Sequence, residues 1–382
     1  MRFFCVATLV LLALVASVEG WRVESRARDG LMTFEAFIKQ FNKDYSPSEY
    51  VKRKQIFEAN VVDILKHNSE GHSYYKGINE MSDWTHDEFM HLNAARGLMK
   101  QKVTQNLHDS FTVKQFERTN RSLPHRVDYR RHHPPILTSI KNQGNCGSCW
   151  AHSAVEAIES HWALATGNLH VLSQQQITSC TPNPNHCGGT GGCSGSVEQL
   201  AFAYIHDAGG IAEEWSYPYT SYYGDSGVCK SVSPFEMIAK VKGYVEVAKD
   251  DQEALMEAVA YEGPISVSVD ATYWQSYAGG IFNGCNYSLN ITQNHAVQLV
   301  GYGFERKTNQ HYWLIRNSWG PRWGEHGYMR LLRTRKPECG WDVNTHMGSA
   351  CDGDPDTEWV CGTCGILTGA SYPIPDVGSF AH

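Results

Sequence analysis

The stretch Gln143-Gly-Asn-Cys146-Gly-Ser-Cys149-Trp150 decides how this chain of 382 residues folds and which chemistry it carries. A helical run follows over residues 150–165, and Gly167 ends it. A thiol at a helix N-terminus has its thiolate stabilised by the helix dipole and by N–H groups without a partner in the helix. The stretch therefore predicts a nucleophilic cysteine. The spacing Cys146-x-x-Cys149 also permits a redox pair or a metal site, but a thioredoxin-like motif needs a strand before it.

Two later segments carry residues that would complete a site around such a thiol. His295 directly precedes the apolar run 296–300, and Asn317 follows the strand-like run 312–315. Alone, a histidine at the start of a strand more often has a structural role. The segment around Asn317 is, by itself, typical of a turn with an aromatic residue that fills space. A cysteine nucleophile needs a base, and the base needs a third group that orients it. The order Cys, His, Asn therefore indicates nucleophilic catalysis.

Together the three segments resemble the papain-like cysteine proteases, whose local signature is Cys-Gly-Ser/Ala-Cys-Trp/Tyr. His295 lies 146 residues after Cys149, and Asn317 lies 22 after His295; both gaps are slightly long, which insertions would explain. The resemblance implies that Cys149 attacks, that His295 protonates the leaving amine and that Asn317 fixes the tautomer of His295. It also implies that Trp319 shields this bond, that Gln143 and the Cys149 N–H bind the oxyanion, and that no cofactor is needed.

The front of the chain has a helical pattern of its own. Three phenylalanines recur at helical spacing, and six later residues keep to one stripe of a long helix: Phe34, Phe37 and Phe41, then Glu49, Arg53, Phe57, Asn60, Ile64 and Asn68. Residues 77–83, Gly-Ile-Asn-Glu-Met-Ser-Asp, alternate with the period of a strand. The stripe and this run resemble the two motifs of the inhibitory propeptides of cathepsin L-like proteases. Such a propeptide packs on its own enzyme and runs backwards through the substrate cleft.

Three parts of the chain are expected. Residues 1–20, with Arg2 before an apolar run and small residues at its end, are typical of a cleaved signal peptide. Residues 21–121 would be the inhibitory propeptide and 122–382 the peptidase domain, with maturation cleavage within a few residues of Ser122. The resemblance implies an α+β fold of the papain type. A mostly helical half, about 124–235, would carry Cys149, and a strand-rich, barrel-like half, about 236–382, would carry His295.

Composition and charge narrow the range of partners. A formal net charge of −7 without an evident basic patch argues against nucleic acid, and no segment after residue 20 reads as a membrane span. Three glycosylation sequons fit secretion: Asn120, Asn286 and Asn290. We expect a soluble monomer that takes protein and peptide substrates. It would follow the secretory pathway to a lysosome, to a digestive vacuole or out of the cell.

Eleven of the twelve cysteines lie in residues 122–382, where an oxidising compartment would allow disulfides. The resemblance implies three pairs: Cys146–Cys193, Cys180–Cys229 and Cys285–Cys364. It leaves open the pairing of Cys187, Cys339, Cys351 and Cys361. The last three lie in or beside an insertion, about residues 337–361, whose acidic residues permit a calcium site. A surface loop held by disulfides is favoured, because the rest of an EF-hand loop is missing.

The residues expected to contact substrate are Gly195, Ser196, Gly369 and Trp319. Ser196 stands where the family has a glycine that contacts the substrate backbone, and its side chain would narrow the cleft. Gly369 aligns with the floor of the main specificity pocket, which predicts a bulky apolar residue at substrate position P2. His152 replaces a usual phenylalanine, either as a packing variant, which is favoured, or as a titratable neighbour of Cys149. The absence of a long occluding loop predicts an endopeptidase.

Two other functions stay open. A non-catalytic homologue could act as a binding or storage protein, although such relatives usually lose the nucleophile or the histidine, and both are present here. A released propeptide could inhibit related proteases, and this could coexist with enzyme activity. Acid is expected to weaken the propeptide contact, with Asp83, Glu49 and the nearby histidines as candidate triggers.

Overall fold

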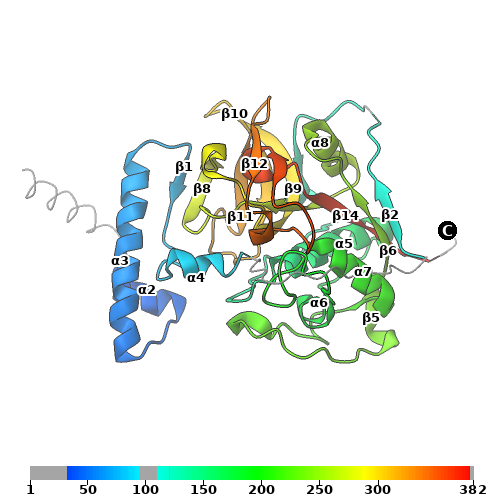
Figure 1. The fold of residues 1–382 in the computed structure, drawn as a ribbon, viewed down its shortest axis with the longest axis horizontal. Helices are drawn as coiled ribbons and strands as arrows, with labels where there is room; N and C mark the ends of the chain where they lie inside the picture. The colour runs from blue at the N-terminus through cyan, green and yellow to red at the C-terminus, as the bar shows by residue number, and fades with distance from the viewer. Residues whose placement is uncertain (1–31, 94–109, 120, 379–382) are drawn as a thin grey trace, which may run out of the picture.

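The computed structural model describes residues 32–93, 110–119 and 121–378. The expected signal peptide and Asn120 lie outside these residues. In Figure 1 the first helices stand at one end of the molecule, and the rest of the chain forms a helical half and a half rich in strands. The expected α+β fold of the papain type, preceded by a mostly helical segment, is confirmed.

The two front helices are α2 (Phe34–Phe41) and α3 (Pro47–Ser69). Each begins at a hydroxyl N-cap, Thr33 or Ser46, whose side chain accepts a hydrogen bond from a backbone N–H of the first turn. Their apolar faces meet in one cluster of rings that includes Phe34, Phe37, Phe41 and Phe57. The ring centroids of Phe37 and Phe57 are 4.8 Å apart, so the two helices are joined by aromatic packing.

The strand expected over residues 77–83 is wrong. The strand ends earlier, as β1 (Tyr74–Lys76), and residues 77–83 form irregular chain and turns that lead to α4 (His86–Met90). The side chain of Asn79 accepts a hydrogen bond from the N–H of Met81 at 2.9 Å, and the N–H of Asn79 donates to Ser82 Oγ at 2.9 Å. Side chains thus take the backbone groups that a strand would use. The alternation came from residue types that favour turns.

The helical half contains α5 (Cys149–Thr166), α6 (Gln174–Cys180) and α7 (Glu198–Ala208). α5 is buried along most of its length, because α6, α7 and the strands of the other half all pack against it. Gly167 ends α5 in the left-handed conformation, with φ of 77°, as the sequence predicted. The helix starts at Cys149 itself.

Within the described ranges, ten strands form one sheet in the order β1-β8-β11-β10-β9-β7-β14-β6-β2, with β3 on β9. After β1, these strands are β2 (Thr112–Gln115), β3 (Val127–Asp128), β6 (Val241–Glu246), β7 (Ile265–Val269), β8 (Tyr277–Phe282), β9 (His295–Glu305), β10 (Gln310–Arg316), β11 (Tyr328–Arg333) and β14 (Ala370–Pro375). The runs singled out at 296–300 and 312–315 both fall within strands. Both β9 and β10 extend beyond their apolar runs.

Smaller elements complete the two halves. α8 (Gln252–Tyr261) packs on the sheet, and β4 (Ile211–Ala212) pairs with β5 (Met237–Ala239). The insertion is built on a hairpin of β12 (Cys339–Asp342) and β13 (Glu358–Cys361). In the part of the chain that the structure describes, no helix has the length and apolar character of a membrane span.

The front piece adds a strand to each end of this sheet. β1 pairs antiparallel with β8, and β2 pairs in parallel with β6. Figure 1 shows the two strands on opposite sides of the molecule. The edge of a sheet presents unpaired backbone groups that a further strand can use. The front piece is therefore held by backbone pairing at two separate edges.

Buried polar contacts join the two halves beside α5. Ser153 donates from Oγ to the carbonyl of Val297 at 3.0 Å, and Ser266 donates from Oγ to the carbonyl of Ser153 at 3.1 Å. Arg316, fully buried at the end of β10, donates to the carbonyl of Ser139 at 2.7 Å. These contacts position the start of α5 beside the start of β9, where the predicted catalytic residues lie.

Candidate active site

Cys149 is the first residue of α5 and is only 1% exposed. The other ten cysteines of the described ranges pair in five disulfides, and Cys149 is in none of them. An 18-residue helix starts at this thiol, so its N-terminal N–H groups and dipole favour the thiolate. The environment suits a nucleophile.

His295 begins β9, and Asn317 directly follows β10, its antiparallel neighbour. His295 Nε2 lies 2.9 Å from Asn317 Oδ1, and an amide oxygen can only accept, so Nε2 carries the proton. The Trp319 ring stacks on His295 with centroids 4.6 Å apart and covers this bond. His295 Nδ1 has no hydrogen-bond partner among the described residues. The ring therefore offers the lone pair of Nδ1.

Burial lowers the pKa of His295 to about 4, and the hydrogen bond with Asn317 only partly opposes the shift. The imidazole is therefore neutral in this precursor over most of the acidic range. A neutral ring with its proton on Nε2 is the form that can take a proton from a thiol. Cys149 and His295 line the same small hollow, which also contains Ser196 and Asn294.

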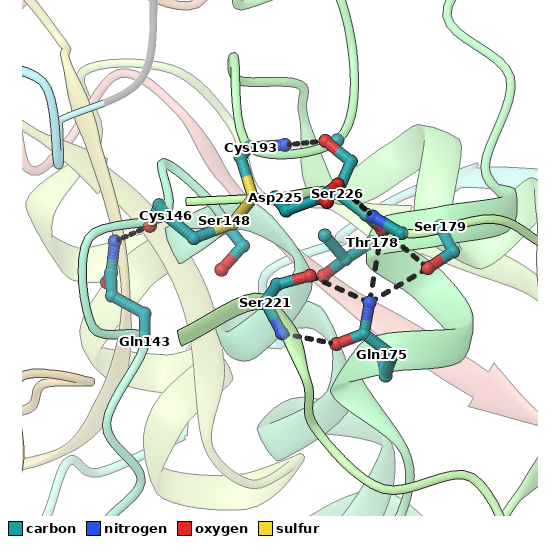
Figure 2. The surroundings of a disulfide bond; sticks show 12 residues. Gln143, Cys146, Ser148, Gln175, Thr178, Ser179, Cys193, Ser221, Asp225 and Ser226 are labelled. Carbon is teal, nitrogen blue, oxygen red and sulfur yellow. Dashed lines mark hydrogen bonds between the residues drawn. A yellow bond between two sulfur atoms is a disulfide. The ribbon is translucent and has the colours of Figure 1, made fainter. Parts of the chain in front are cut away.

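Gln143 is fully buried next to this pair. Its Nε2 donates to the carbonyl of Cys146 at 2.8 Å, and its Oε1 accepts from Ser318 Oγ at 2.7 Å. Figure 2 shows Gln143 close to the Cys146–Cys193 disulfide, which holds the loop that turns into α5. A side-chain amide fixed on both sides is a preorganised donor.

The front piece reaches into the site after α4. Gln143 Nε2 also donates to the carbonyl of Leu92 at 3.1 Å, so a backbone oxygen of the front piece uses this donor. Phe89, fully buried on α4, packs edge-on against Trp319 with ring centroids 5.3 Å apart. Both contacts cover the groups around His295, as an inhibitory segment would.

The stripe of α3 positions α4. Arg53 binds Glu88 on α4 and Glu49 on its own helix, and it donates to the carbonyl of Asp83 at 2.9 Å. Asn60 donates to the carbonyl of Ser82 at 2.9 Å. Through Arg53 and Asn60, the predicted stripe therefore contacts the turn before α4 and α4 itself. Asp83 is buried and pairs with Lys43 at 3.2 Å and with the Tyr45 hydroxyl.

The residues predicted to contact substrate separate into two groups. Ser196 lines the hollow beside Cys149, and the neighbouring Gly195 adopts φ of 90°. Gly369 lies behind Ser268 and Gln293. A Cβ built on it would meet Ser268 Cβ at 3.1 Å and Gln293 Nε2 at 3.6 Å. Ser268 and Gln293 line the hollow themselves. Sequence reasoning missed both, because no motif marks them.

His152 is a packing residue in this structure. It is 1% exposed, its Nδ1 donates to the carbonyl of Ser148 at 2.9 Å, and its ring packs edge-on against Tyr219. Burial lowers the pKa of His152 to about 3. It therefore stays neutral at mildly acidic pH, which supports the packing interpretation over the titratable one.

The structure joins the three expected disulfides: Cys146–Cys193, Cys180–Cys229 and Cys285–Cys364. The four remaining cysteines form Cys187–Cys351 and Cys339–Cys361. Three acidic residues of the insertion have partners within the protein: Asp352 contacts His186, Asp356 contacts His346, and Asp354 accepts from the N–H of Cys351. These contacts fit the stapled loop that was favoured over a calcium site.

Two sequons are described. Asn286 is exposed, whereas Asn290 is half-buried, and its amide contacts both Thr292 Oγ1 at 2.8 Å and the N–H of Val343 at 2.7 Å. Within the described residues, one group of side chains has its ligand atoms close enough together to hold a metal ion. It consists of His67, Glu70 and His72, at the end of α3.

Comparison with known proteins identifies the class. Residues 123–349 match the papain family cysteine proteases, and residues 34–89 match the cathepsin propeptide inhibitor domain (I29). The chain therefore belongs to the papain family of cysteine proteases and is a proenzyme with its own inhibitor domain. It is a cysteine-type endopeptidase of the cathepsin L-like kind.

Several relatives are similar over most of the chain. Pro-cathepsin H of Bos taurus is 36% identical over 346 residues, which are 90% of this chain and 89% of the relative. A cathepsin L-like protein of Caenorhabditis elegans is 35% identical over 377 residues, 96% of this chain and 98% of the relative. The structure of digestive procathepsin L 3 from Tenebrio molitor larval midgut superposes with a TM-score of 0.70 at 32% identity, over 89% of this chain and 97% of that chain.

Proposed function

We propose that this proenzyme hydrolyses peptide bonds with Cys149, His295, Asn317 and Gln143 as its catalytic residues. One observation carries the proposal: His295 is oriented by Asn317 so that Nδ1 has no hydrogen-bond partner among the described residues, at a site whose thiol begins a long helix. The steps below use only groups of this chain, the substrate and water.

The Cys149 thiol gives its proton to His295 Nδ1, and its sulfur bonds to the carbonyl carbon of the scissile peptide. Gln143 Nε2 and the Cys149 N–H stabilise the negative oxygen that results. The C–N bond breaks as His295 returns the proton to the leaving amine, which leaves a thioester on Cys149. His295 then takes a proton from water, the hydroxide oxygen attacks the thioester, and the acid and the thiol are released.

Propeptide residues block this reaction by occupying or covering groups that it needs. The carbonyl of Leu92 accepts from Gln143 Nε2, and Phe89 covers Trp319. We place maturation near Ser122, in a segment whose residues 121 and 122 are exposed. The Ser122 carbonyl accepts from the Tyr261 hydroxyl at 2.6 Å, so this segment lies close to α8 in the uncut chain.

Delivery through the secretory pathway fits the five disulfides of the described residues and the signal-like start of the chain. A lysosome, a digestive vacuole and the extracellular space are the destinations proposed, with Asn286 as the more accessible of the two described sequons and a monomer as the working form. The preference for a bulky apolar P2 residue stays a prediction drawn from Gly369, and the observed lining of the pocket does not favour it.

The test compares wild-type precursor with Cys149→Ala. Both are incubated at mildly acidic pH with a thiol reductant, and the size of the chain and the hydrolysis of a denatured protein substrate are followed. We expect wild type to lose about a hundred residues and to gain activity, and the variant to do neither. A wild-type chain that stays inert after another protease has removed residues 21–121 would favour a binding or storage protein.

A further inference from the structure

The 337–361 insertion reaches the hollow that contains Cys149. Gly348 and Ser349, which lie between β12 and β13, line it together with Ser196 and Glu198 from the helical half and Gln293 from the strand-rich half. Gly348 packs closely on the strand-rich half, because a Cβ built there would meet the Gln293 carbonyl at 2.9 Å. A segment that looks like a surface insertion in the sequence is thus a wall of the pocket beside the nucleophile.

The insertion is fastened to the opposite half of the enzyme. The Cys187–Cys351 disulfide joins it to the loop before Cys193, over a sequence separation of 164 residues. Backbone bonds flank the disulfide: the N–H of Gly188 donates to the Ala350 carbonyl at 3.1 Å, and the N–H of Asp352 donates to the Asn185 carbonyl at 2.8 Å. The wall is therefore tied to both halves, across the cleft between them.

The floor of the pocket is closed by a polar side chain. Gln293 is 4% exposed, and its Nε2 donates to the carbonyl of Gly365 at 2.9 Å and to that of Ser268 at 3.3 Å. These bonds fix the amide in front of Gly369, in the space that the missing side chain of this glycine would otherwise open. A large apolar side chain would have to displace an amide that has its hydrogen bonds satisfied.

Two further residues of the lining, Ser196 and Glu198, also favour a polar guest. The Ser196 hydroxyl is buried, at 5% exposure of the residue, and has no hydrogen-bond partner among the described residues. Leaving a buried hydroxyl without a partner is unfavourable, so a substrate group that bonds to it gains affinity. An apolar guest would leave Ser196 unpaired and would place carbon against Glu198, which is 3% exposed.

We propose that residues 348–352, tied to the helical half by Cys187–Cys351, form a specificity wall, and that the pocket selects a small hydrogen-bonding side chain, that of Ser, Thr or Asn, at P2. This inference rests on the proposed peptidase function and replaces only its P2 preference. The specificity wall limits the size of the P2 side chain, Gln293 limits how far it enters the pocket, and Ser196 supplies the hydrogen bond.

The experiment measures kcat/KM of the acid-activated enzyme for blocked dipeptide substrates with Ser, Thr, Asn, Leu or Phe at P2 and one common P1 residue. The three small polar residues should exceed Leu and Phe by about tenfold, which corresponds to one hydrogen bond to Ser196. A best rate with Leu or Phe would overturn the proposal while leaving the peptidase function intact.

Variants separate the wall from general stability. The double variant Cys187→Ser/Cys351→Ser unties the wall, so the Ser-to-Leu ratio should fall at least fivefold. Removing Cys180–Cys229, a disulfide within the helical half, is the matched control and should leave the ratio unchanged. If the untied enzyme does not fold, Ser196→Gly gives the same reading, because it removes the unpaired hydroxyl; an unchanged ratio in either variant contradicts the proposal.

An enzyme inert on every substrate would refute the peptidase function, and the pocket can then be tested by binding. Cys149→Ala chain, from which another protease has removed the propeptide, is titrated with the same blocked dipeptides as free acids in a calorimeter. Tighter binding of the Ser, Thr and Asn peptides supports the wall and its polar pocket. Tighter binding of the Leu or Phe peptide, or equal binding of all five, overturns them.

Discussion

Arg53 holds Glu88 through two parallel hydrogen bonds, from Nη1 to Oε2 at 2.7 Å and from Nη2 to Oε1 at 2.8 Å. The pair joins the long helix α3 to the short helix α4, which carries Phe89 onto Trp319. Glu88 also accepts from the N–H of Thr85 at 2.8 Å and so closes the capping box of α4. One carboxylate therefore both starts α4 and fixes it to the stripe.

Glu88→Gln should let the precursor process itself at a higher pH. Burial alone would raise the pKa of Glu88, but its bonds to Arg53 hold it below the ordinary value of 4.5. A carboxyl with a lowered pKa stabilises the folded contact above pH 4.5, and that stability is lost as the pH falls through its folded-state pKa. Wild type should therefore resist processing until the pH is below 4.5, and the variant, without the charge, should not.

The pair is partly exposed, with 17% and 32% of the two side chains accessible, so its contribution is about 1 kcal/mol, or roughly fivefold in processing rate above pH 4.5. Gel analysis of precursor size against pH gives that rate. Glu58→Gln, at an exposed position on the same helix, is the control. Identical pH profiles for Glu88→Gln and Glu58→Gln would remove Glu88 from the acid trigger.

Much of this arrangement could be predicted from the sequence, and the failures have physical reasons. The α3 stripe, α5 and the strands at His295 and Asn317 were predictable because each lies on a single element whose periodicity or capping residue is local. The turn at 77–83 was misread because the alternation of Asn79 and Met81 imitates a strand, while side-chain bonds to the backbone decide the conformation.

The wall of the pocket could not be predicted for a different reason. Cys187 and Cys351 are 164 residues apart, and four unassigned cysteines allow three pairings, so no local signal identifies the partner. Gln293 is adjacent to the motif that contains His295, yet only the folded chain shows its amide in front of Gly369. Contacts between distant loops are set by tertiary packing, which residue patterns do not encode.

Gln143→Ala should lower kcat by about 10²–10³-fold and leave KM nearly unchanged, because the amide donates to an oxygen that becomes negative only in the transition state. Steady-state kinetics on the activated enzyme measures both constants. The same change removes the donor for the Leu92 carbonyl, so the precursor should also hold its propeptide less tightly. A rise in KM at constant kcat would show that Gln143 binds ground-state substrate instead.

Phe89→Ala should make the uncut precursor partly active at neutral pH. The side chain is fully buried against Trp319, and removing a buried phenylalanine costs about 3–5 kcal/mol, much of it in the propeptide–enzyme contact. We expect at least a hundredfold rise in the labelling of Cys149 by an alkylating agent in uncut precursor. Val62→Ala, at a position 38% exposed on α3, is the control and should label as slowly as wild type. Equal labelling of Phe89→Ala and Val62→Ala would show that α4 does not shield the thiol.

Glu198→Gln should stabilise the precursor at neutral pH but not at acidic pH. Burial raises the pKa of Glu198 from 4.5 to about 7, so the folded chain binds a proton that the unfolded chain has lost between these values. The contribution of Glu198 to the free energy of unfolding is therefore complete below pH 4.5. It is lost as the pH rises towards 7, by about 3 kcal/mol in total. The amide never ionises and avoids this loss.

Urea unfolding of the Cys149→Ala precursor, which cannot process itself, measures the effect with and without Glu198→Gln. The buried imidazoles of His152, His161 and His295 have pKa values lowered by burial, so they oppose the trend by losing stability as the pH falls below 6.5. The chains with and without Glu198→Gln share these histidines, so the difference between their free energies of unfolding reports on the carboxyl alone. That difference should be near zero at pH 4.5 and about 2–3 kcal/mol in favour of the variant at pH 7.5. A difference that does not change with pH would show that Glu198 is ionised in the folded chain throughout, held so by a partner in the pocket.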